Sequence, residues 1–372
     1  MSGTLIAIDA RELGGRPTGV GRYLSHLLTA WDAQPEARCH EFVLYAPGPL
    51  QGRLPPTPNL RLRVREVTGS GGTWWEQVRF PAALARDRPA VLLSPAYSAP
   101  LGTAVPVVLT VHDVSFVAHP EWFPPRVRLR RRVVTTLAAR RARTVLTISA
   151  FSGREIVARL GVPAGRVRVI PLALTSPGPA LLSPPARETL VLFVGSIFNR
   201  RHLPVLIRAV ARLAPHHPSL RLAIVGEDRS YPVEHLAGIA RAEGIEERVS
   251  LTSYVPDDEL ALLYSRASAF AFLSDYEGFG LTPLEALAAG VPVVAGDTPV
   301  AREIYGEAAR YVPTGDPGAV ALALEAVLFE PASRAALLEA APAVLARYSW
   351  ERVARETLAV LLEAAAGASH GR

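Results

Sequence analysis

Two glutamates, Glu277 and Glu285, flank the part of the chain whose residue types point most clearly to chemistry. Between them lies a Gly-Phe-Gly turn at residues 278–280, followed by Thr282, a favourable N-cap, and Pro283, which suits the first position of a helix. Such a helix directs backbone N–H groups and a partial positive charge toward a ligand. The segment therefore predicts an anion site, apt for a diphosphate, with a carboxylate on either side to bind ligand hydroxyl groups.

Two cations lie at the start of another predicted helix. Arg200 and Arg201 follow a turn at Gly195 and Ser196, which itself follows the apolar run 191–194. Cations are unfavourable at a helix N-terminus unless an anion binds there, so these side chains are candidates for holding phosphate. The alternative is a solvated arginine pair. All 40 basic residues of the chain are arginines, so any cationic phosphate contact must use a guanidinium group.

A histidine and two glycines extend the set of candidates. His112 follows the apolar run 107–111, which places it at the carboxyl end of a predicted strand. It is either a site residue or a satisfied structural histidine, and Asp113 either orients it or caps the following loop. Gly19 and Gly21 form a Gly-x-Gly loop that lacks the third glycine of a dinucleotide fingerprint, which counts against a dehydrogenase.

Apolar runs alternate with amphipathic stretches along the chain, a pattern typical of an α/β fold with parallel sheets covered by helices. The runs cover residues 5–8, 42–45, 91–94, 107–111, 145–148, 191–194, 222–225 and 291–295. Prolines interrupt the pattern after residue 171, which predicts a linker at 177–188 between an N-terminal domain, 1–176, and a C-terminal domain, 189–348. The last segment, 349–372, is expected to form a helix that packs back across the domains. Ligands in such folds bind beyond the carboxyl ends of the strands, so we expect the site in the cleft between the domains.

The composition is typical of a globular protein rather than a disordered or membrane-spanning one. Of 372 residues, 49% are hydrophobic and 20% are charged, and no uninterrupted apolar tract reaches the length of a membrane span. The first apolar run is too short for a signal peptide, and the single cysteine, Cys39, excludes an internal disulfide and a zinc site built from several cysteines. These features predict a cytoplasmic protein.

The net charge of +6 is densest between Arg126 and Arg143, where arginines are interleaved with apolar residues on a predicted helix. A basic amphipathic helix can lie on anionic lipid, which predicts peripheral association with the inner membrane face. The alternative is a helix packed on the core whose arginines are only solvated. Aromatic residues do not accompany the charge, so no nucleic-acid partner is expected.

In these motifs the chain resembles the retaining glycosyltransferases of family four, whose GT-B fold consists of two facing Rossmann-like domains with parallel sheets. The resemblance is carried by the frame E-G-F-G-L-x-x-L-E-A-x-A-x-G-x-P-V-V, from Glu277 to Val294, and by the element around Arg200, which is similar to G-T-x-x-x-R-K-N-L. In the second element Arg201 replaces the usual lysine and His202 the usual asparagine. The resemblance covers nearly the whole chain.

By this resemblance Glu277 contacts the transferred sugar, Glu285 holds the ribose hydroxyls, and His112 reaches the sugar from the N-terminal domain. Residues 253–260 resemble the family's loop beside the nucleotide base. Two structural alternatives stay open: a capping box of Glu285 with Thr282, and a plain helix start capped by Asp257 in place of that loop. The catalytic residues that the family implies are His112, Glu277, Arg200 and Arg201. The implied donor-binding residues are Gly19, Gly21, Gly195, Ser196, Tyr254, Val255, Gly278, Phe279, Gly280, Leu281 and Glu285.

The resemblance implies that a hexose moves, with retention, from a nucleoside-diphosphate sugar to a glycan, lipid-linked or small-molecule acceptor. The opening Asp9-Ala-Arg11 and residues 18–23 resemble mannosyl-transferring members, which favours GDP-mannose as donor. An Asp-x-Asp element is absent, so we expect no metal, and no cofactor is implied. The rival functions are a non-hydrolysing sugar-nucleotide epimerase and a non-catalytic nucleotide-sugar-binding protein.

Overall fold

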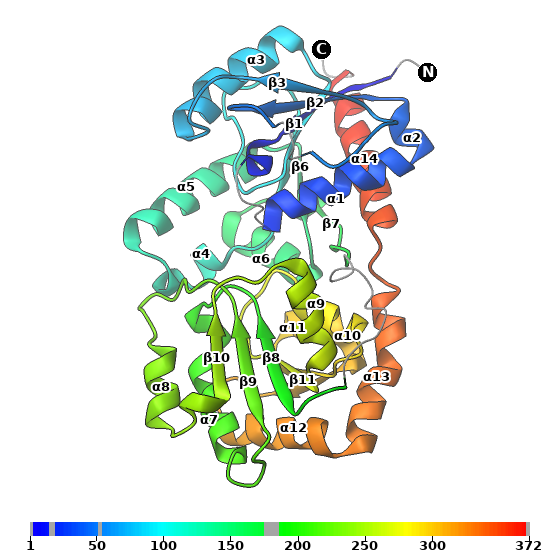
Figure 1. Cartoon of the computed structure of the whole chain (residues 1–372). Coiled ribbons are helices and arrows are strands. Elements are labelled where there is room, and N and C mark those ends of the chain that lie inside the picture. Colours follow the sequence, from blue (N-terminus) through cyan, green and yellow to red (C-terminus); the bar gives the residue numbers. More distant parts are fainter. Residues whose placement is uncertain (1–2, 15–18, 51–53, 175–185, 370–372) are drawn as a thin grey trace. The chain divides into compact units, whose positions relative to one another are not determined.

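The computed structural model describes residues 3–14, 19–50, 54–174 and 186–369, and the chain forms two compact units. Unit 1 comprises Met1–Ala118, Pro125–Ala173 and Ser349–Arg372, and unit 2 comprises His119–Pro124 and Leu174–Tyr348. Each unit is a parallel sheet with helices packed against it (Figure 1), which confirms the predicted α/β fold with two Rossmann-like domains. Most of the predicted linker, 177–185, lies outside the described residues.

Unit 1 contains a seven-stranded sheet in the order β3-β2-β1-β4-β5-β6-β7, and all its neighbouring strands are parallel. The strands are β1 (Leu5–Asp9), β2 (Glu41–Ala46), β3 (Arg61–Glu66), β4 (Val91–Ser94), β5 (Val107–Thr110), β6 (Thr144–Thr147) and β7 (Val167–Val169). The helices are α1 (Gly19–Ala33), α2 (Pro35–Arg38), α3 (Phe80–Asp87), α4 (Ser115–Ala118), α5 (Pro125–Arg141), α6 (Ala150–Leu160) and α14 (Trp350–Ser369). The apolar runs predicted in this half form β1, β2, β4, β5 and β6.

Unit 2 contains a six-stranded parallel sheet in the order β10-β9-β8-β11-β12-β13. The strands are β8 (Leu190–Val194), β9 (Arg221–Val225), β10 (Val249–Thr252), β11 (Ala269–Phe272), β12 (Val293–Gly296) and β13 (Ala309–Val312). The helices are α7 (Leu203–Leu213), α8 (Leu236–Ala242), α9 (Asp257–Arg266), α10 (Leu281–Ala288), α11 (Pro299–Tyr305), α12 (Pro317–Phe329) and α13 (Pro331–Leu345). The three runs predicted in this half form β8, β9 and β12.

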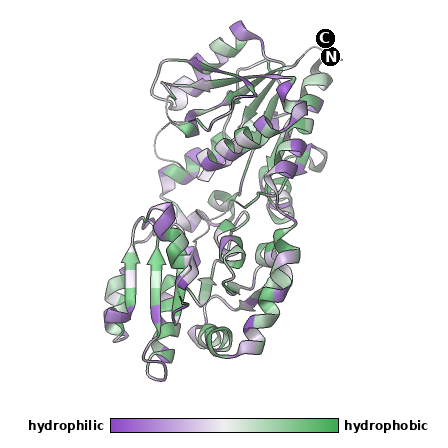
Figure 2. Ribbon diagram, turned by 45° about the vertical axis from the view of Figure 1, so that its right-hand side comes forward, coloured by the Kyte–Doolittle hydropathy of each residue, from purple (hydrophilic) through white to green (hydrophobic). Residues whose placement is uncertain are grey.

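The central strands of both sheets are buried at nearly every position, because helices cover both of their faces. Figure 2 shows these strands mainly in the hydrophobic colour, whereas the helices carry both colours. Aromatic pairs fill each core: Trp31 stacks on Phe42 at 5.0 Å between ring centroids in unit 1, and Phe193 stacks on Phe272 at 6.1 Å in unit 2. The packed strands fix the positions at which the following loops begin.

The chain returns to unit 1 for its last helix. α14 packs against α1, where the indole N–H of Trp31 donates a hydrogen bond to the Ala354 carbonyl across 2.8 Å. The side-chain amide of Gln34 donates to the Glu351 carbonyl across 2.7 Å. Unit 1 is therefore assembled from the first and the last parts of the chain.

Helix α5 carries its large apolar side chains on the outside. Leu129 is 63% exposed, and Val127, Val133 and Leu137 are exposed as well. The residues of α5 that face the core are the small ones, Thr135, Ala138 and Ala139. α5 therefore packs on the core through small residues, and its larger apolar side chains are left at the surface. In the described part of the chain no helix is long and apolar enough to cross a membrane.

Candidate active site

The turns that follow β8 and β11 bring the two arginines and the first glutamate together. β8 and β11 are paired in the unit 2 sheet, so the loops beyond their carboxyl ends meet. Nε of Arg201 donates a hydrogen bond to Oε1 of Glu277 across 3.0 Å, and Nε of Arg200 lies 3.8 Å from the same oxygen. Two segments that the sequence marked separately thus form one cluster of opposite charges.

Arg201 is fixed by its surroundings. Its Nη1 donates to the Ser196 carbonyl across 2.8 Å, and its guanidinium lies 5.0 Å from the centre of the Phe272 ring. Gly195 has a φ of +139°, and a Cβ added there would come within 2.4 Å of Nη1 of Arg201. The glycine of this turn is therefore required both by its backbone conformation and by the close approach of the arginine.

The Nε–H group of Arg200 is a buried donor that lacks an acceptor among the described residues. Its guanidinium lies 4.3 Å from the centre of the Phe198 ring and 5.8 Å from that of Trp122. Nε of Arg200 is inaccessible to solvent and has no hydrogen-bond partner in the described part of the chain. An unsatisfied buried donor costs about 1–3 kcal/mol, and more in a charged group, so this site favours an incoming anion.

The carboxylate of Glu277 is charged at neutral pH. Burial raises its pKa, but the positive charges of Arg201 and Arg200 and hydrogen bonds from Ser274 and Arg201 outweigh burial, so the pKa lies below its ordinary value. The Ser274 hydroxyl donates to Oε1 across 2.8 Å. Glu277 is thus a fixed anion that keeps two guanidinium groups in place.

The Gly-Phe-Gly turn leads into α10 two residues earlier than the sequence predicted. The N-cap is Gly280, with φ of +89°, and α10 begins at Leu281, so the expected N-cap Thr282 and first helical residue Pro283 are wrong. The reason is tertiary: the Tyr305 hydroxyl donates to the Gly280 carbonyl across 3.1 Å, and a Cβ at Gly280 would lie 2.0 Å from that hydroxyl.

This N-terminus still offers donors to an anion. The first amides of a helix lack partners within it, and in α10 these belong to Leu281 and Thr282, since Pro283 has no N–H. Gly278 and Phe279 precede them, and the Phe279 side chain is buried against Tyr348 with 5.2 Å between ring centroids. The Phe279 ring is therefore part of the core of unit 2. At the other end of α10, Gly290 has a left-handed φ of +70°, a conformation in which helices commonly end.

Glu285 has a partner that sequence reasoning missed. The hydroxyl of Tyr264, a fully buried residue of α9, donates to Oε2 of Glu285 across 3.0 Å. Burial and the negative charge of Glu285 raise the pKa of Tyr264 well above its usual range. A capping box with Thr282 as N-cap is wrong, because Gly280 holds that position.

A second missed contact links the turns after β8 and β11. Nε2 of His202 lies 2.5 Å from Oδ2 of Asp275, and the Thr314 hydroxyl donates to Oδ1 across 2.5 Å. Burial raises the pKa of Asp275, but these partners lower it to a net value below the usual range. His202 has a left-handed φ of +49°, which suits the asparagine usual in the resembling family.

The loop after β10 exposes Tyr254 to solvent and buries Val255. Tyr254 is 72% exposed. The following helix, α9, begins at Asp257 and has Pro256 as N-cap, so the expected capping role of Asp257 is wrong.

His112 lies in unit 1, just beyond β5. Its Nε2 is 3.0 Å from the Pro95 carbonyl, which can only accept, so Nε2 carries the proton. Burial lowers the pKa of His112, although the Pro95 carbonyl opposes this shift, and the neutral ring therefore keeps Nδ1 as an acceptor. Asp113 accepts from the backbone and side chain of Ser115 at 2.8 and 2.6 Å and from the Tyr97 hydroxyl at 3.0 Å, so it caps the loop.

Arg11 in the same unit is held by acidic partners. It forms a bidentate ion pair with Asp9, at 2.9 and 2.6 Å, and a second pair with Glu76 at 2.6 Å. A cavity of about 640 Å³ lies beside this cluster, beyond the carboxyl ends of β1, β2 and β4. Gly19 begins α1 and Gly21 is buried within it, while residues 17 and 18 lie outside the described part of the chain. Glu76 and this cavity carried no signal in the sequence.

Family models match both halves of the chain. The model described as "Glycosyltransferase Family 4" matches residues 17–174, and the model described as "Glycosyl transferases group 1" matches residues 182–344. The chain is 29% identical to O-antigen chain mannosyltransferase B of Escherichia coli, over 68% of each chain. It is 31% identical to D-inositol 3-phosphate glycosyltransferase of Acidothermus cellulolyticus, over 70% of this chain and 63% of that relative.

Solved structures share the fold over almost the whole chain. The sucrose-phosphate synthase of Thermosynechococcus elongatus superposes with a TM-score of 0.77 at 20% identity, covering 98% of this chain and 100% of that one. HepE of Anabaena, in complex with UDP and glucose, superposes with a TM-score of 0.71 at 18% identity, covering 97% of this chain and 100% of that one.

Proposed function

Because this chain belongs to the family four glycosyltransferases, which adopt the GT-B fold, we propose that it transfers a hexose from a nucleoside-diphosphate sugar to an acceptor hydroxyl with retention of configuration. The observation that carries the proposal is the buried Nε of Arg200, which lacks a hydrogen-bond partner beside Arg201 within the described residues. A donor diphosphate would supply the missing acceptor oxygen. Unit 2 is then the donor-binding unit.

In the proposed reaction the bond between the anomeric carbon and the diphosphate oxygen breaks, and the acceptor oxygen bonds to that carbon on the same face. The acceptor proton passes to the leaving phosphate. Arg200, Arg201 and the N-terminus of α10 stabilise the negative charge that grows on the diphosphate. Glu277 binds hydroxyls of the transferred sugar, and His112, neutral with Nδ1 as acceptor, binds another. Glu285 binds the ribose diol.

The donor we favour is GDP-mannose. The similarity of the opening residues to mannosyl-transferring members supports it, as does the likeness to a mannosyltransferase of Escherichia coli. UDP-glucose is the competing donor, because HepE, which shares the fold, binds UDP and glucose. Both donors present the same ribose diphosphate to Glu285 and Arg201, so the base and the sugar decide between them.

The acceptor is proposed to bind in unit 1. The 640 Å³ cavity beside β1 is lined by Asp9, Glu12 and Ser98, whose oxygens suit the hydroxyls of a neutral glycan. Arg11 also lines it, but this guanidinium is occupied by Asp9 and Glu76 and is poorly available to an anionic acceptor. A lipid-linked glycan is consistent with the exposed valines, leucines and arginines of α5, which would hold the protein at a membrane.

Release of nucleoside diphosphate from GDP-mannose and from UDP-glucose tests the proposal. We expect slow hydrolysis of one donor without acceptor, abolished in Arg201→Gln. The epimerase alternative predicts instead a new sugar nucleotide with the diphosphate intact. A protein that binds a donor but releases no diphosphate with any glycan acceptor would support the non-catalytic alternative.

A further inference from the structure

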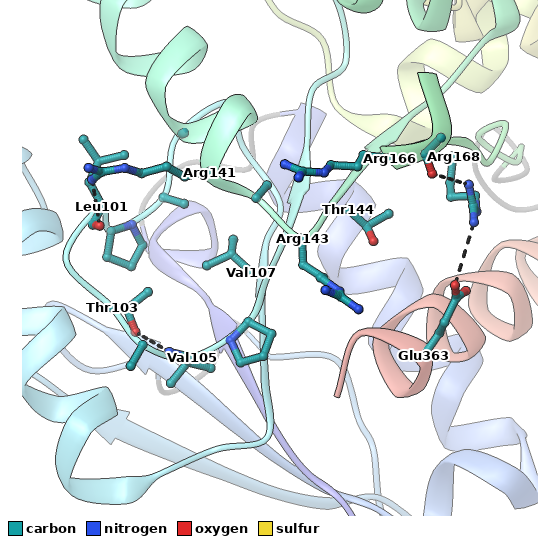
Figure 3. A pocket seen from close by; sticks show the side chains of 17 residues that line it. Leu101, Thr103, Val105, Val107, Arg141, Arg143, Thr144, Arg166, Arg168 and Glu363 are labelled. Carbon is teal, nitrogen blue, oxygen red and sulfur yellow. Dashed lines mark hydrogen bonds and ion pairs between the residues drawn. The ribbon is translucent and has the colours of Figure 1, made fainter. Parts of the chain in front are cut away.

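A second basic cavity lies in unit 1, away from the transfer site. It has a volume of about 700 Å³ and is bordered by the first residues of β5 and β6, Val107 and Thr144, and by η4 (Ala164–Arg166), which leads into β7 (Figure 3). The strands are parallel, so His112 lies beyond their carboxyl ends, at the opposite edge of the sheet. The volume falls within the range of roughly 300–1,000 Å³ that is usual for small-molecule sites.

Four arginines line this cavity, and one carboxylate accompanies them. They are Arg141 at the end of α5, Arg143 before β6, Arg166 in η4 and Arg168 in β7. Glu363 of α14 lies 3.8 Å from Arg168, and no carboxylate in the described ranges pairs with the other three. The helix dipole favours a cation at the end of α5, which explains Arg141 alone.

Backbone carbonyls anchor three of these guanidinium groups at the rim. Arg141 donates to the Leu101 carbonyl across 3.0 Å, and Arg168 donates to that of Gly165 across 3.0 Å. Arg166 donates to the Arg140 carbonyl across 3.3 Å. A carbonyl fixes the position of a guanidinium but does not neutralise its charge. The guanidinium groups that line the cavity thus repel one another, and a bound anion would reduce this repulsion.

We propose that this cavity binds the phosphoryl group of a phosphorylated ligand. A phosphoryl group offers three oxygens to guanidinium forks that come from different elements, whereas a carboxylate offers two oxygens in one plane. The floor between the arginines contains Val105, Pro106 and Val107, so the cavity has room and apolar surface for the group that carries the phosphate. The proposal is independent of the transfer reaction, because the site lies at the other edge of the sheet.

The phosphoryl group can come from a soluble compound or from a lipid headgroup. The exposed apolar side chains of α5, Leu129, Val133 and Leu137, lie on the helix that ends at Arg141. A membrane bound along α5 would therefore reach the rim of the cavity with its headgroups. The same arginines serve either source, so only a comparison of probes separates them.

Calorimetric titration with inorganic pyrophosphate and sedimentation with phospholipid vesicles test the proposal on the full chain. The variant is Arg143→Gln/Arg168→Gln, and the matched control is Arg86→Gln, an exposed arginine in the last turn of α3. Arg201→Gln serves as a separate control, because it removes pyrophosphate binding at the donor site only. Melting temperatures establish that each variant is folded.

For a soluble ligand we expect a pyrophosphate site that the double variant weakens at least tenfold and that Arg201→Gln and Arg86→Gln leave intact. For a lipid ligand we expect the double variant to lose binding to equimolar phosphatidic acid and phosphatidylcholine vesicles, while pyrophosphate binding stays unchanged. If the double variant binds both probes as the wild type does, the proposal is overturned. That result would leave the donor-site assignment untouched, since Arg201 tests it separately.

Discussion

The hydroxyl of Tyr264 donates a hydrogen bond to Oε2 of Glu285 across 3.0 Å. Tyr264 is fully buried in the core of unit 2, so this contact orients a half-buried carboxylate from a rigid support. The N-cap of α10 is Gly280, so Glu285 does not form a capping box with Thr282. The geometry is that of a carboxylate oriented by a buried hydroxyl group.

Glu285→Gln is expected to weaken donor binding without changing the melting temperature. A carboxylate accepts from both ribose hydroxyls, whereas an amide offers one acceptor and a misplaced donor. The donor dissociation constant should rise roughly tenfold or more, the weight of one charged hydrogen bond at about 1.5–3 kcal/mol. Tyr264→Phe should raise it less, by a few fold, because only the orienting bond is lost. Unchanged affinity in both variants would refute the ribose assignment.

Arg201→Gln should lower kcat/KM about 100- to 1,000-fold, the usual cost of removing one group that stabilises transition-state charge. Arg201→Lys keeps the charge but loses the fork held between Ser196 and Glu277, so its loss should be intermediate. Steady-state kinetics with the preferred donor measure both. Arg208→Gln, on the exposed side of α7, is the matched control and should match the wild type. Equal effects at positions 201 and 208 would contradict a specific role.

The ion cluster of Glu277 should make unit 2 sensitive to acid. The pKa of Glu277 is lowered from 4.5, so the stability that this carboxylate contributes is complete above pH 4.5 and is lost as the pH falls through the lowered value. At neutral pH Glu277→Gln leaves two buried guanidinium groups uncompensated, which costs about 3 kcal/mol. The melting temperature should fall by roughly 2–4 °C for each kcal/mol, and the gap to the wild type should close in acid.

Glu246→Gln, which removes one partner of the exposed pair with Arg241, is the control for this measurement. Its melting temperature should stay near that of the wild type at neutral pH. A Glu277→Gln variant as stable as this control would show that the cluster contributes nothing to folding.

Transfer should proceed in the presence of a chelator. In the described residues no group of three or more His, Cys, Asp or Glu side chains could hold one metal ion, and the proposed chemistry uses guanidinium groups. Activity is to be measured with and without EDTA. Loss of activity that magnesium or manganese restores would contradict the arginine-based account.

Vesicle binding through α5 should require both charge and apolar surface. Leu129→Ser/Val133→Ser removes the most exposed apolar side chains, and sedimentation with phosphatidylglycerol-containing vesicles should fall several-fold. Binding of the wild type should weaken as salt is raised, since each arginine near an anionic surface contributes about 1 kcal/mol. Leu322→Ser, at an exposed leucine of unit 2, is the control. Wild-type binding that salt does not affect would argue against an anionic membrane partner.

The sequence predicted the buried strands well, because strands covered on both faces are continuous apolar runs. It did not identify any of the four edge strands, β3, β7, β10 and β13, nor the central strand β11, whose Ala-Phe-Ala-Phe sequence lacks β-branched residues. Edge strands need no continuous apolar run, and the position of β11 in the centre of its sheet is set by neighbours distant in sequence.

For the candidate site too, the sequence predicted some features and missed others. The sequence placed Arg200 and Arg201 after the predicted strand 191–194, but β11, the strand that precedes Glu277, was not identified, so the proximity of Glu277 to the two arginines was not predicted. The start of α10 was not predicted either, since the Tyr305 hydroxyl, 25 positions away from Gly280, fixes that turn. Tyr264 gave no signal either, because no local spacing distinguishes a buried tyrosine that contacts a carboxylate from one that only fills the core.

The return of α14 to unit 1 sets an order of events during synthesis. The Trp31 indole and its acceptor, the Ala354 carbonyl, are 323 positions apart, so this bond waits until almost the whole chain has left the ribosome. All six strands of unit 2 emerge before α14 and can pair while unit 1 still lacks a helix. Unit 1 therefore begins to fold first and finishes last, and α1 stays uncovered during that interval, exposing surface to chaperones and proteases.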